Sequence, residues 1–437
     1  MPNIPSNPDH NLPQAESLAA ALSAGARYSV LLVAFAGLVF AGVGLGLMPV
    51  ASPTITKSFL GPDFTDAAAG VWLAQYSAAI MLGAGCGGIW LGRLGDRIGR
   101  SRAMGVSIMI YSLFAGAGAL AGSQEQLLGL RFFTGLGIGG MWPTGAALVA
   151  ECFPGASRPL VAGVVGAGIN VGILLLAAIV QLQPLAPESW RWIFSISAIP
   201  ALLGMVVAAV LPESPKWLAQ CARSPGPLRT EGMPRLRELL RPPLLRLTLV
   251  GIALGAVPLV GAWAASKWMF PWAGQVAGTS AHSATTQAYW AAGAVLGGFF
   301  GAPLASWLGR RLSYFLISLA TTLLTCGLFM FTTPVQSIFL PWVFVQGIVA
   351  TLFFGWLPLC LPELFPTRVR AAGAGVTYNT GRFLTAAGSL AAGRLVAAFQ
   401  GDYAKVGALT GLVYALGMVV IWWMPTTPSK SLDADRG

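Results

Sequence analysis

Charged side chains are scarce in this 437-residue sequence. Asp, Glu, Lys and Arg make up only 9% of the residues, whereas ordinary soluble domains hold about 25%, and hydrophobic residues reach 55%. This composition excludes a soluble globular protein, because most of the chain could not face water. A net charge of +11 does not indicate nucleic-acid binding, since the cations are dispersed over short segments instead of being gathered in one domain.

Residue types that carry catalysis and metal binding are also few. The two histidines, His10 and His282, lie outside the apolar runs, and no nucleophile, base and orienting group can be assembled. The cysteines show neither a disulfide framework nor a metal-ligand spacing. We therefore expect a protein that is not an enzyme and that needs no cofactor and no metal. The cysteines are Cys86, Cys152, Cys221, Cys326 and Cys360.

Long apolar runs dominate what is present. A helix needs about 20 apolar residues to cross a bilayer and satisfies its backbone hydrogen bonds internally, so each run predicts one spanning helix. We predict an all-α integral membrane protein with twelve transmembrane helices. The runs lie near residues 28–50, 68–91, 104–122, 127–150, 159–181, 190–211, 247–270, 286–308, 313–332, 338–360, 372–398 and 404–424.

The distribution of basic residues predicts the orientation. If the N-terminus is cytoplasmic, 19 of the 26 Lys and Arg residues fall on the cytoplasmic side, where cations are known to collect. Both termini are therefore expected in the cytoplasm, as tails at 1–27 and 425–437. The first apolar run is too long for a cleaved signal peptide. We expect a multi-pass protein of the cell (inner) membrane whose partners are lipid and a small solute, with no nucleic acid.

An internal repeat divides the chain into two halves. Residues 151–158 and 363–370 share the pattern E-x-F-P-x-x-x-R at an offset of 212 residues. Parallel repeats of this kind are related by an axis along the membrane normal, with the solute site at mid-depth on that axis. We predict six-helix halves at 28–211 and 247–424. The cytoplasmic linker between them, 212–246, is expected to be amphipathic and to lie on the inner leaflet.

The charged segment at 92–102 reads GRLGDRIGRSR and separates two apolar runs. Its pattern G-x-x-x-D-R-x-G-R resembles the loop between the second and third helices of major facilitator superfamily transporters. The resemblance implies two six-helix, pseudo-symmetric halves, a solute site between them and transport by alternating access. Residues 212–218, PESPKWL, resemble the sugar porters of that superfamily. Residues 365–382, FPTRVRAAGAGVTYNTGR, look most like its sialic-acid and aromatic-acid porters.

Acidic residues are missing at mid-depth, since all fifteen fall in a loop, a tail or at a helix end. The proton-coupled porters that the chain resembles carry an aspartate in the first helix, often facing an arginine in the fourth. Here the first run, FAGLVFAGVGLGLMPV, has no ionisable side chain, although Arg131 stands in the fourth. This combination resembles the facilitative sugar carriers, which do not couple to protons. A group elsewhere could still titrate, so protons remain a candidate coupling ion.

Cations inside a membrane are costly and are therefore functional candidates. Arg382 lies about ten residues into the eleventh run, roughly 15 Å along the helix axis. Because no helix supplies an acidic partner, Arg382 favours a solute whose carboxylate would act as its counter-ion. Alternatively, Arg382 has a structural role and its guanidinium is hydrogen-bonded to neighbouring carbonyls. The repeat places Asn170 of the fifth run at the position equivalent to Arg382, where it either faces Arg382 across the cavity or joins two helices by a hydrogen bond. Asn379 lies just under one turn before Arg382 on the same helix. Arg131 is a site or gate candidate that could instead snorkel.

Other polar and aromatic residues could line the cavity, although such side chains in membrane helices are more often packing or belt residues. Lys267 is one candidate, but its place toward the outer end of the seventh run, beside Trp263 and Trp268, favours an interfacial anchor. The remaining substrate-binding candidates are Gln75, Tyr76, Trp142, Gln346 and Trp356.

Charged motifs at the cytoplasmic face predict a gate. Asp96 is expected at the N-terminal end of a helix, where unpaired amides and the helix dipole favour a carboxylate. Ion pairs that form only in the outward-open state would shift the population toward it, although positive-inside topology alone would also explain the arginines. The expected pairs join Arg97, Arg100, Arg158 and Arg370 with Glu151 and Glu363.

These patterns favour a secondary transporter of a small organic anion, such as a sugar acid or an aromatic or aliphatic carboxylate. A neutral sugar or polyol porter is the alternative within the family, and a non-transporting nutrient sensor is the alternative from another class. The short tails weigh against a sensor, and the lack of an embedded carboxylate weighs against an exporter of cationic drugs. The chain is expected to act as a monomer.

Overall fold

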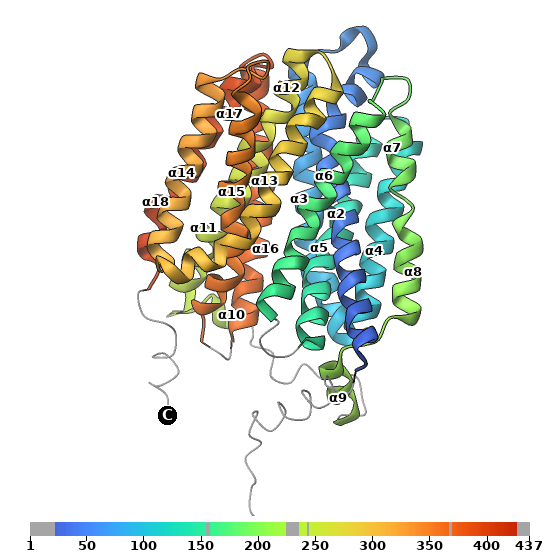
Figure 1. Ribbon diagram of the computed structural model, residues 1–437, viewed down its shortest axis with the longest axis vertical. Helices are drawn as coiled ribbons and strands as arrows, with labels where there is room; N and C mark the ends of the chain where they lie inside the picture. The colour runs from blue at the N-terminus through green and yellow to red at the C-terminus, as the bar shows by residue number, and fades with distance from the viewer. Residues whose placement is uncertain (1–21, 154–157, 224–235, 243, 367–368, 426–437) are drawn as a thin grey trace, which may run out of the picture.

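The computed structural model describes residues 22–153, 158–223, 236–242, 244–366 and 369–425. Within these ranges the chain forms helices and no strands, and the long helices run side by side in one bundle (Figure 1). Ten helical segments are long and apolar enough to cross a membrane. Two further helices, α5 (Gln124–Cys152) and α16 (Arg370–Ala398), have 29 residues each, and the predicted twelve-helix membrane fold is confirmed.

The first half supplies six of the twelve spans. Short 3-10 turns, η2 (Gly61–Asp63) and η3 (Gly118–Leu120), follow its first and third spans. The spans are α2 (Ala24–Leu60), α3 (Asp66–Ile98), α4 (Arg100–Ala117), α5, α6 (Arg158–Leu182), and the pair α7 (Arg191–Ile196) and α8 (Pro200–Val210).

The linker carries two short helices, α9 (Pro215–Arg223) and α10 (Leu236–Leu239). In Figure 1 they lie at one end of the bundle, which we call the α9 end, and we call the other the opposite end. The spans of the second half are α11 (Leu244–Val260) continued by η5 (Gly261–Ala265), η6 (Ser266–Trp268) and α12 (Met269–Ala277); α13 (Ser280–Trp307); α14 (Arg310–Phe331); α15 (Phe339–Glu363); α16; and α17 (Tyr403–Gly411) continued by η8 (Leu412–Ala415), α18 (Leu416–Val420) and η9 (Ile421–Trp423).

Prolines explain where spans depart from the expected runs. The sixth run, expected as one helix, is interrupted before Pro200, which opens α8 because a first-turn residue needs no N–H. In the seventh span, Pro258 cannot donate to the carbonyl of Leu254, and that carbonyl accepts a 2.7 Å hydrogen bond from Tyr314 instead. The span then passes through the π-helical turn η5 and the 3-10 turn η6, a change of geometry that often marks a functional site.

Glycines let helices within each half touch backbone to backbone. An ideal Cβ on Gly83 of α3 would lie 2.0 Å from the carbonyl oxygen of Phe132 on α5. In the second half, a Cβ on Gly293 of α13 would lie 2.1 Å from the carbonyl oxygen of Phe344 on α15. Gly83 and Gly293 are 210 residues apart, so the repeat in the sequence corresponds to the same helix contact built twice.

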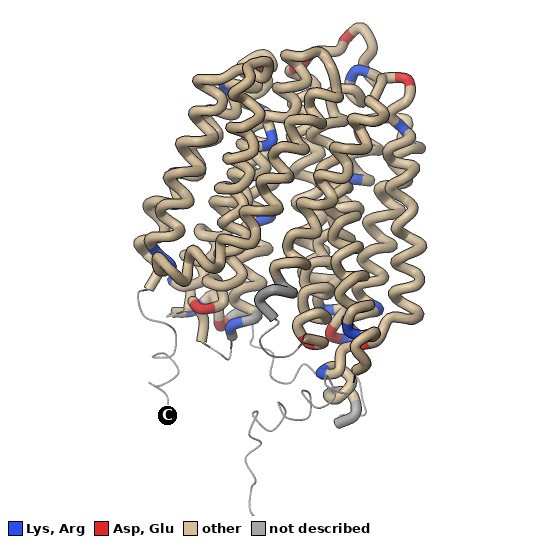
Figure 2. Tube along the Cα trace, viewed as in Figure 1, with Lys and Arg blue, Asp and Glu red and all other residues tan. Residues whose placement is uncertain are grey.

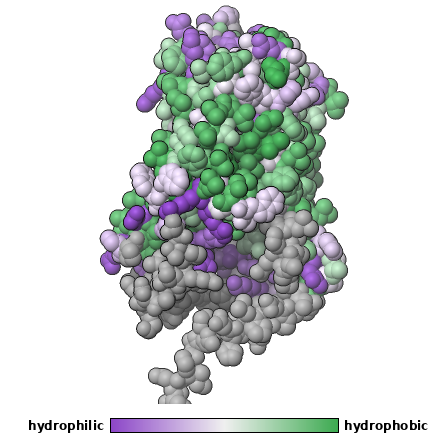
Figure 3. All heavy atoms as spheres, turned by 60° about the vertical axis from the view of Figure 1, so that its left-hand side comes forward, coloured by the Kyte–Doolittle hydropathy of each residue, from purple (hydrophilic) through white to green (hydrophobic). Residues whose placement is uncertain are grey.

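The surface separates into bands that suit a membrane. In Figure 3, hydrophobic residues cover the middle of the visible face and hydrophilic residues gather toward its ends. Figure 2 shows the described acidic residues near the two ends, with few basic residues between them. Exposed apolar side chains such as Leu323 and Val419 would meet lipid rather than water.

Replacing Gly135 by alanine should destabilise the first half. Its Cβ would lie 2.2 Å from the carbonyl oxygen of Ile80, so α3 and α5 would have to separate, and overpacking costs about 1–3 kcal/mol. The apparent melting temperature of the detergent-purified protein measures the effect. Gly129→Ala on the same helix is the matched control, because a Cβ there meets nothing within 4 Å. Equal melting temperatures for the two variants would contradict this account of the contact.

Candidate functional site

A cavity of about 410 Å³ lies between the two halves. The first half contributes residues of α2, α3, α5 and α6 to its wall, and the second half contributes residues of the seventh span, α13, α15 and α16. Most of the wall is apolar. Its polar and aromatic residues are Trp142, Asn170, Trp263, Lys267, Trp290, Thr351, Phe354, Tyr378, Asn379 and Arg382.

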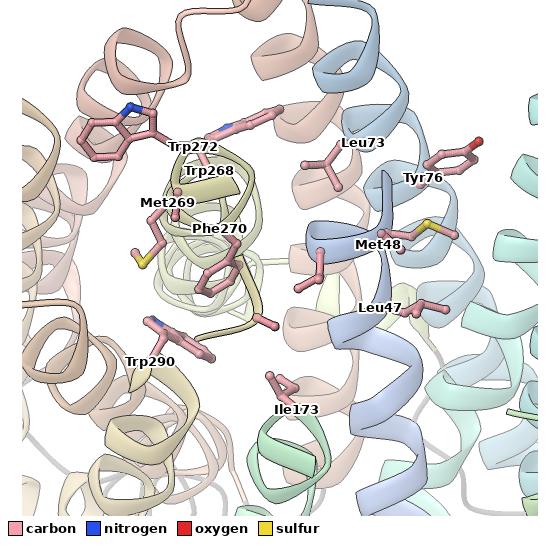
Figure 4. Packing of buried hydrophobic residues seen from close by; sticks show 14 of the residues in the cluster. Leu47, Met48, Leu73, Tyr76, Ile173, Trp268, Met269, Phe270, Trp272 and Trp290 are labelled. Carbon is pink, nitrogen blue, oxygen red and sulfur yellow. The ribbon is translucent and has the colours of Figure 1, made fainter. Parts of the chain in front are cut away.

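A cluster of buried apolar residues from both halves lies between the cavity and the opposite end. We call it the closing cluster, and Figure 4 shows its packing from close by. It brings α2, α3 and α6 of the first half against the seventh span and α13 of the second. Its residues labelled in Figure 4 are Leu47, Met48, Leu73, Tyr76, Ile173, Trp268, Met269, Phe270, Trp272 and Trp290.

Hydrogen bonds reinforce this closure between the halves. The hydroxyl of Tyr403 on α17 donates to the carbonyl of Asp66 on α3 at 2.6 Å. Ser280 at the start of α13 accepts a hydrogen bond from the backbone N–H of Leu185 and donates to its carbonyl, both at 3.1 Å. At this end of the bundle the two halves are therefore joined by apolar packing and by backbone contacts.

The α9 end is arranged differently. The cavity wall continues to Pro362 on α15 and Ala374 on α16, close to where these helices end and begin at the α9 end. Two ion pairs between described residues lie here, and each stays within one half: Asp96 with Arg100 at 2.6 Å, and Arg310 with Glu363 at 2.9 Å. This conformation is held together at the opposite end, and the cavity extends toward the α9 end.

Arg382 reaches the cavity wall from α16 and crosses to the first half. Its Nη1 donates to the carbonyl of Ala84 on α3 at 2.8 Å and to Oδ1 of Asn379 at 3.2 Å. Its guanidinium carbon lies 5.2 Å from the centre of the Tyr378 ring. Gly88 of α3 leaves the space for this arrangement, because a Cβ there would lie 2.5 Å from Asn379 Oδ1.

The two predicted asparagines also line the cavity. Asn379 donates to the carbonyl of Gly375 at 2.9 Å and so presents its oxygen to Arg382. Asn170 reaches the cavity from α6 in the first half, and among the described residues its side chain has no hydrogen-bond partner. Its amide is therefore available to a solute.

Lys267 lies in the cavity wall, and the expectation of an interfacial anchor is wrong. Its side chain is only 7% exposed, and its Nζ lies 3.9 Å from the centre of the Trp263 ring. The reason is the irregular turn η6, which places Lys267 under the closing cluster rather than at a membrane surface. The predicted aromatic neighbour is present, but it is part of the cavity wall.

Arg131 and Tyr76 lie outside the cavity. Arg131 is fully buried, its nitrogens have no hydrogen-bond partner among the described residues, and its guanidinium lies 5.3 Å from the Phe194 ring centre. It precedes the cavity residue Ile138 by two turns of α5, so it lies at the level of the closing cluster instead. Tyr76 belongs to that cluster and donates to Gln124 Oε1 at 3.2 Å.

Three further candidates also face away from the cavity. Gln75 is half-buried and is not among the lining residues. Gln346 accepts a 2.7 Å hydrogen bond from Trp290 and donates to Ser266 at 2.8 Å. It therefore holds the ring of Trp290 in the cavity wall without lining the cavity itself. Trp356 donates to the carbonyl of Arg310. Thr351 and Phe354, at helical spacing, form the cavity face of α15 instead.

Of the ten predicted substrate-binding residues, the structure thus brings five together in the cavity wall. Their role in binding stays a prediction. The five are Trp142, Asn170, Lys267, Asn379 and Arg382. Trp290, Phe354 and Tyr378 also line the cavity but were not predicted. Predicting them would require the rotation of each helix, which decides the side chains that face the cavity.

The predicted gate residues pair differently from the expectation. Glu213, not Asp96, occupies a helix N-terminus: it accepts hydrogen bonds from the backbone N–H groups of Arg100 at 2.7 Å and Ser101 at 3.0 Å. Asp96 pairs with Arg100 on the next helix, because the turn at Gly99 brings them together. The PESPKWL motif therefore contributes a cap to α4. A carboxylate is favoured there because it accepts hydrogen bonds from the unpaired N–H groups of the first turn and interacts well with the helix dipole.

The repeated glutamates also have partners from outside the predicted set. Glu363 pairs with Arg310, and Glu151 accepts a hydrogen bond from the hydroxyl of Ser214. Arg97 is exposed, and Nε of Arg370 donates to the carbonyl of Phe365 at 3.4 Å. The side chain of Arg158 lies outside the described residues. A gate that pairs these groups across the halves remains a prediction for another conformation.

The chain is similar to known transporters in both sequence and structure. The family model of the Major Facilitator Superfamily matches residues 86–390. A probable 4-methylmuconolactone transporter of Cupriavidus pinatubonensis is 30% identical over 352 residues, which cover 79% of this chain and 80% of the relative. The cis,cis-muconate transport protein of Acinetobacter baylyi is 26% identical, covering 84% and 89%. The crystal structure of a D-xylose-proton symporter has a TM-score of 0.71 at 16% identity, covering 92% and 98%.

Cysteines at Leu185 and Ser280 should lock the opposite end shut. The side chain of Ser280 already contacts the Leu185 backbone, so Leu185→Cys with Ser280→Cys should crosslink under mild oxidation. If the halves separate here during turnover, the crosslink should stop solute uptake into proteoliposomes, and a reductant should restore it. The two single variants are the controls. Full uptake by crosslinked protein would show that this end does not open.

Proposed function

The chain belongs to the major facilitator superfamily, and we propose that the solute this transporter carries is a small organic anion. Family and relatives identify a multi-pass membrane transporter rather than an enzyme. Alternating access is the mechanism we propose, with the cavity between the halves as the solute site.

The charge of the cavity supports this proposal more than any other observation. Arg382 and Lys267 both reach its wall, and no Asp or Glu occurs among its described lining residues. A buried cation without a counter-charge is costly, and a bound organic anion would supply that charge. Arginine has five N–H donors in a planar fork, more than the bonds to Ala84 and Asn379 use, so it can also receive a carboxylate.

The aromatic lining of the cavity supports a small, flat solute. Trp142, Trp263, Trp290, Phe354 and Tyr378 provide ring faces around the polar groups. Such faces bury apolar surface and pack well against planar skeletons. The relatives named for 4-methylmuconolactone and cis,cis-muconate agree with a small organic solute. The likeness to the xylose symporter supports the fold alone.

We place the α9 end in the cytoplasm and the protein in the cell membrane, with both termini inside. The positive-inside distribution of Lys and Arg supports this orientation. In that orientation the structure is inward-facing, because the closing cluster and the Tyr403–Asp66 hydrogen bond shut the outer end. Solute would then exchange with the cytoplasm through the region beside Pro362 and Ala374.

Arg382→Gln should remove the preference for anions. A charge-assisted hydrogen bond contributes about 1.5–3 kcal/mol, so the native protein should bind benzoate roughly 10- to 150-fold more tightly than benzamide, which has the same size. Arg382→Lys keeps the charge but loses the planar fork, so it should weaken binding and retain part of the preference. Isothermal titration calorimetry on the detergent-purified protein measures each affinity.

Arg394→Gln is the matched control, since Arg394 lies on the same helix but is exposed. It should bind both compounds as the native protein does. If Arg382→Gln binds benzoate unchanged, or if D-xylose is bound and carried as well as any anion, the organic-anion proposal fails. The neutral sugar porter would then take its place.

Transport should proceed without a proton gradient. The described spans carry acidic residues only near their ends, such as Asp66, Asp96 and Glu363, so no carboxylate is placed at mid-depth to carry a proton. Proteoliposomes should therefore show exchange and facilitated diffusion of the best-binding anion, unchanged by a protonophore. Concentrative uptake that collapses with the protonophore, in the absence of any other ion gradient, would show the opposite.

A further inference from the structure

The cavity wall carries two cations, Arg382 and Lys267, and a solute with a single carboxylate would pair with only one of them. Arg382 contacts α3 at Ala84, which lies between the cavity residues Met81 and Gly88 of that helix. Lys267 adjoins Trp268 and lines the cavity together with Trp290, and because both tryptophans belong to the closing cluster, Lys267 lies toward the shut end of the cavity. A solute that fills the cavity along its axis would meet both.

The backbone around Lys267 is fixed by contacts that do not use its amine. Ser266 shares a 2.9 Å hydrogen bond with the hydroxyl of Tyr414, and it accepts one from Gln346 at 2.8 Å. The indole N–H of Trp268 donates to the carbonyl of Ala264 at 2.8 Å, and its ring stacks on Tyr403. Lys267 is thus held between two anchored neighbours.

The amine itself has no polar partner. Among the described residues Lys267 makes no ion pair and no hydrogen bond, and its Nζ is held only against the ring of Trp263. A structural lysine of this degree of burial would be expected to have a carboxylate or carbonyls around it. The side chain is therefore positioned as a donor toward the cavity and is left without an acceptor by the protein.

We propose that the solute carries a second anionic group, and that the cavity binds a planar dicarboxylate. One carboxylate would accept from the fork of Arg382, and the other would accept from the amine of Lys267 at the shut end. The rings of Trp142, Trp263 and Phe354 would pack against the unsaturated or aromatic skeleton between them. This inference rests on the proposed organic-anion function and adds the substrate class.

Charge balance favours a dianion over a monoanion. The described lining residues contribute two cations and no acid, so a monoanion would leave one positive charge in the cavity without a counter-charge. A dianion neutralises both. The two charges also fix the orientation of the solute, because the point charge of an ammonium and the fork of a guanidinium make different contacts with a carboxylate.

Matched ligands test the second anionic group directly. Phthalate, isophthalate and terephthalate are each compared with the corresponding monoamide, which has the same shape and one charge fewer. Calorimetry on the detergent-purified full-length protein at pH 7.5, where both carboxylates are ionised, measures the affinities. For at least one isomer, the native protein should bind the dianion roughly 10- to 150-fold more tightly than the monoamide.

Variants at Lys267 assign that preference to its amine. Lys267→Met should lose the preference and bind the dianion no more tightly than the monoamide, and measurable binding of the monoamide shows that the variant is folded. Lys267→Arg should recover part of the preference. Lys405→Met is the control, because Lys405 is exposed and paired with Asp402.

The outcomes separate this inference from the proposed function. If monoamides and benzoate bind but no dianion binds more tightly, or if Lys267→Met keeps the preference, the second anionic group is refuted and the organic-anion proposal stands. If neither the dianions nor the monoamides nor benzoate bind, the organic-anion proposal itself fails.

Discussion

A lipid bilayer supplies no counter-ions and no hydrogen-bond partners, and this constraint governs where every charge in the protein lies. Acidic residues occur near the helix ends, where Glu213 caps α4 and Glu363 pairs with Arg310. Cations that remain at depth must find partners in the protein or in a solute. Arg382 has partial partners in Ala84 and Asn379, whereas Lys267 has only a ring face. Arg131 is also buried without a hydrogen-bond partner among the described residues, but it lies outside the cavity, so the cations that can meet a solute there are Arg382 and Lys267.

Packing within a half and packing between halves follow different rules. Within a half, Gly83 and Gly293 allow helix backbones to touch, so each half can behave as a rigid unit. Between the halves, the closing cluster relies on large apolar side chains that can separate and repack, together with the Tyr403–Asp66 contact. Arg382 bridges the halves through Ala84, so a solute bound at its guanidinium would be linked physically to their relative movement.

The candidate site was predictable where chemistry alone singles out a residue. An arginine near mid-membrane without an acid, and an asparagine at the equivalent position of the repeat, pointed to Arg382 and Asn170, and both line the cavity. Arg131, a candidate for the site or a gate that could instead snorkel, lies two turns before the first cavity residue of α5, at the level of the closing cluster. The positions of aromatic and amide residues could not be predicted from residue type. The predicted Gln346 lies behind the cavity wall, where it bonds Trp290, whereas Trp290, which was not predicted, lines the cavity.

The sequence by itself determined the membrane class, the twelve spans and the division into two halves, because apolar runs, basic loops and a repeat are local patterns written along the chain. Tertiary structure decided what those patterns bring together. Only the fold shows that irregular turns follow Pro258 in the seventh span and carry Lys267 into the cavity. Glu213 caps α4 from 113 residues away along the chain. Such partners depend on depth, helix rotation and contact between distant segments, and no local pattern specifies these.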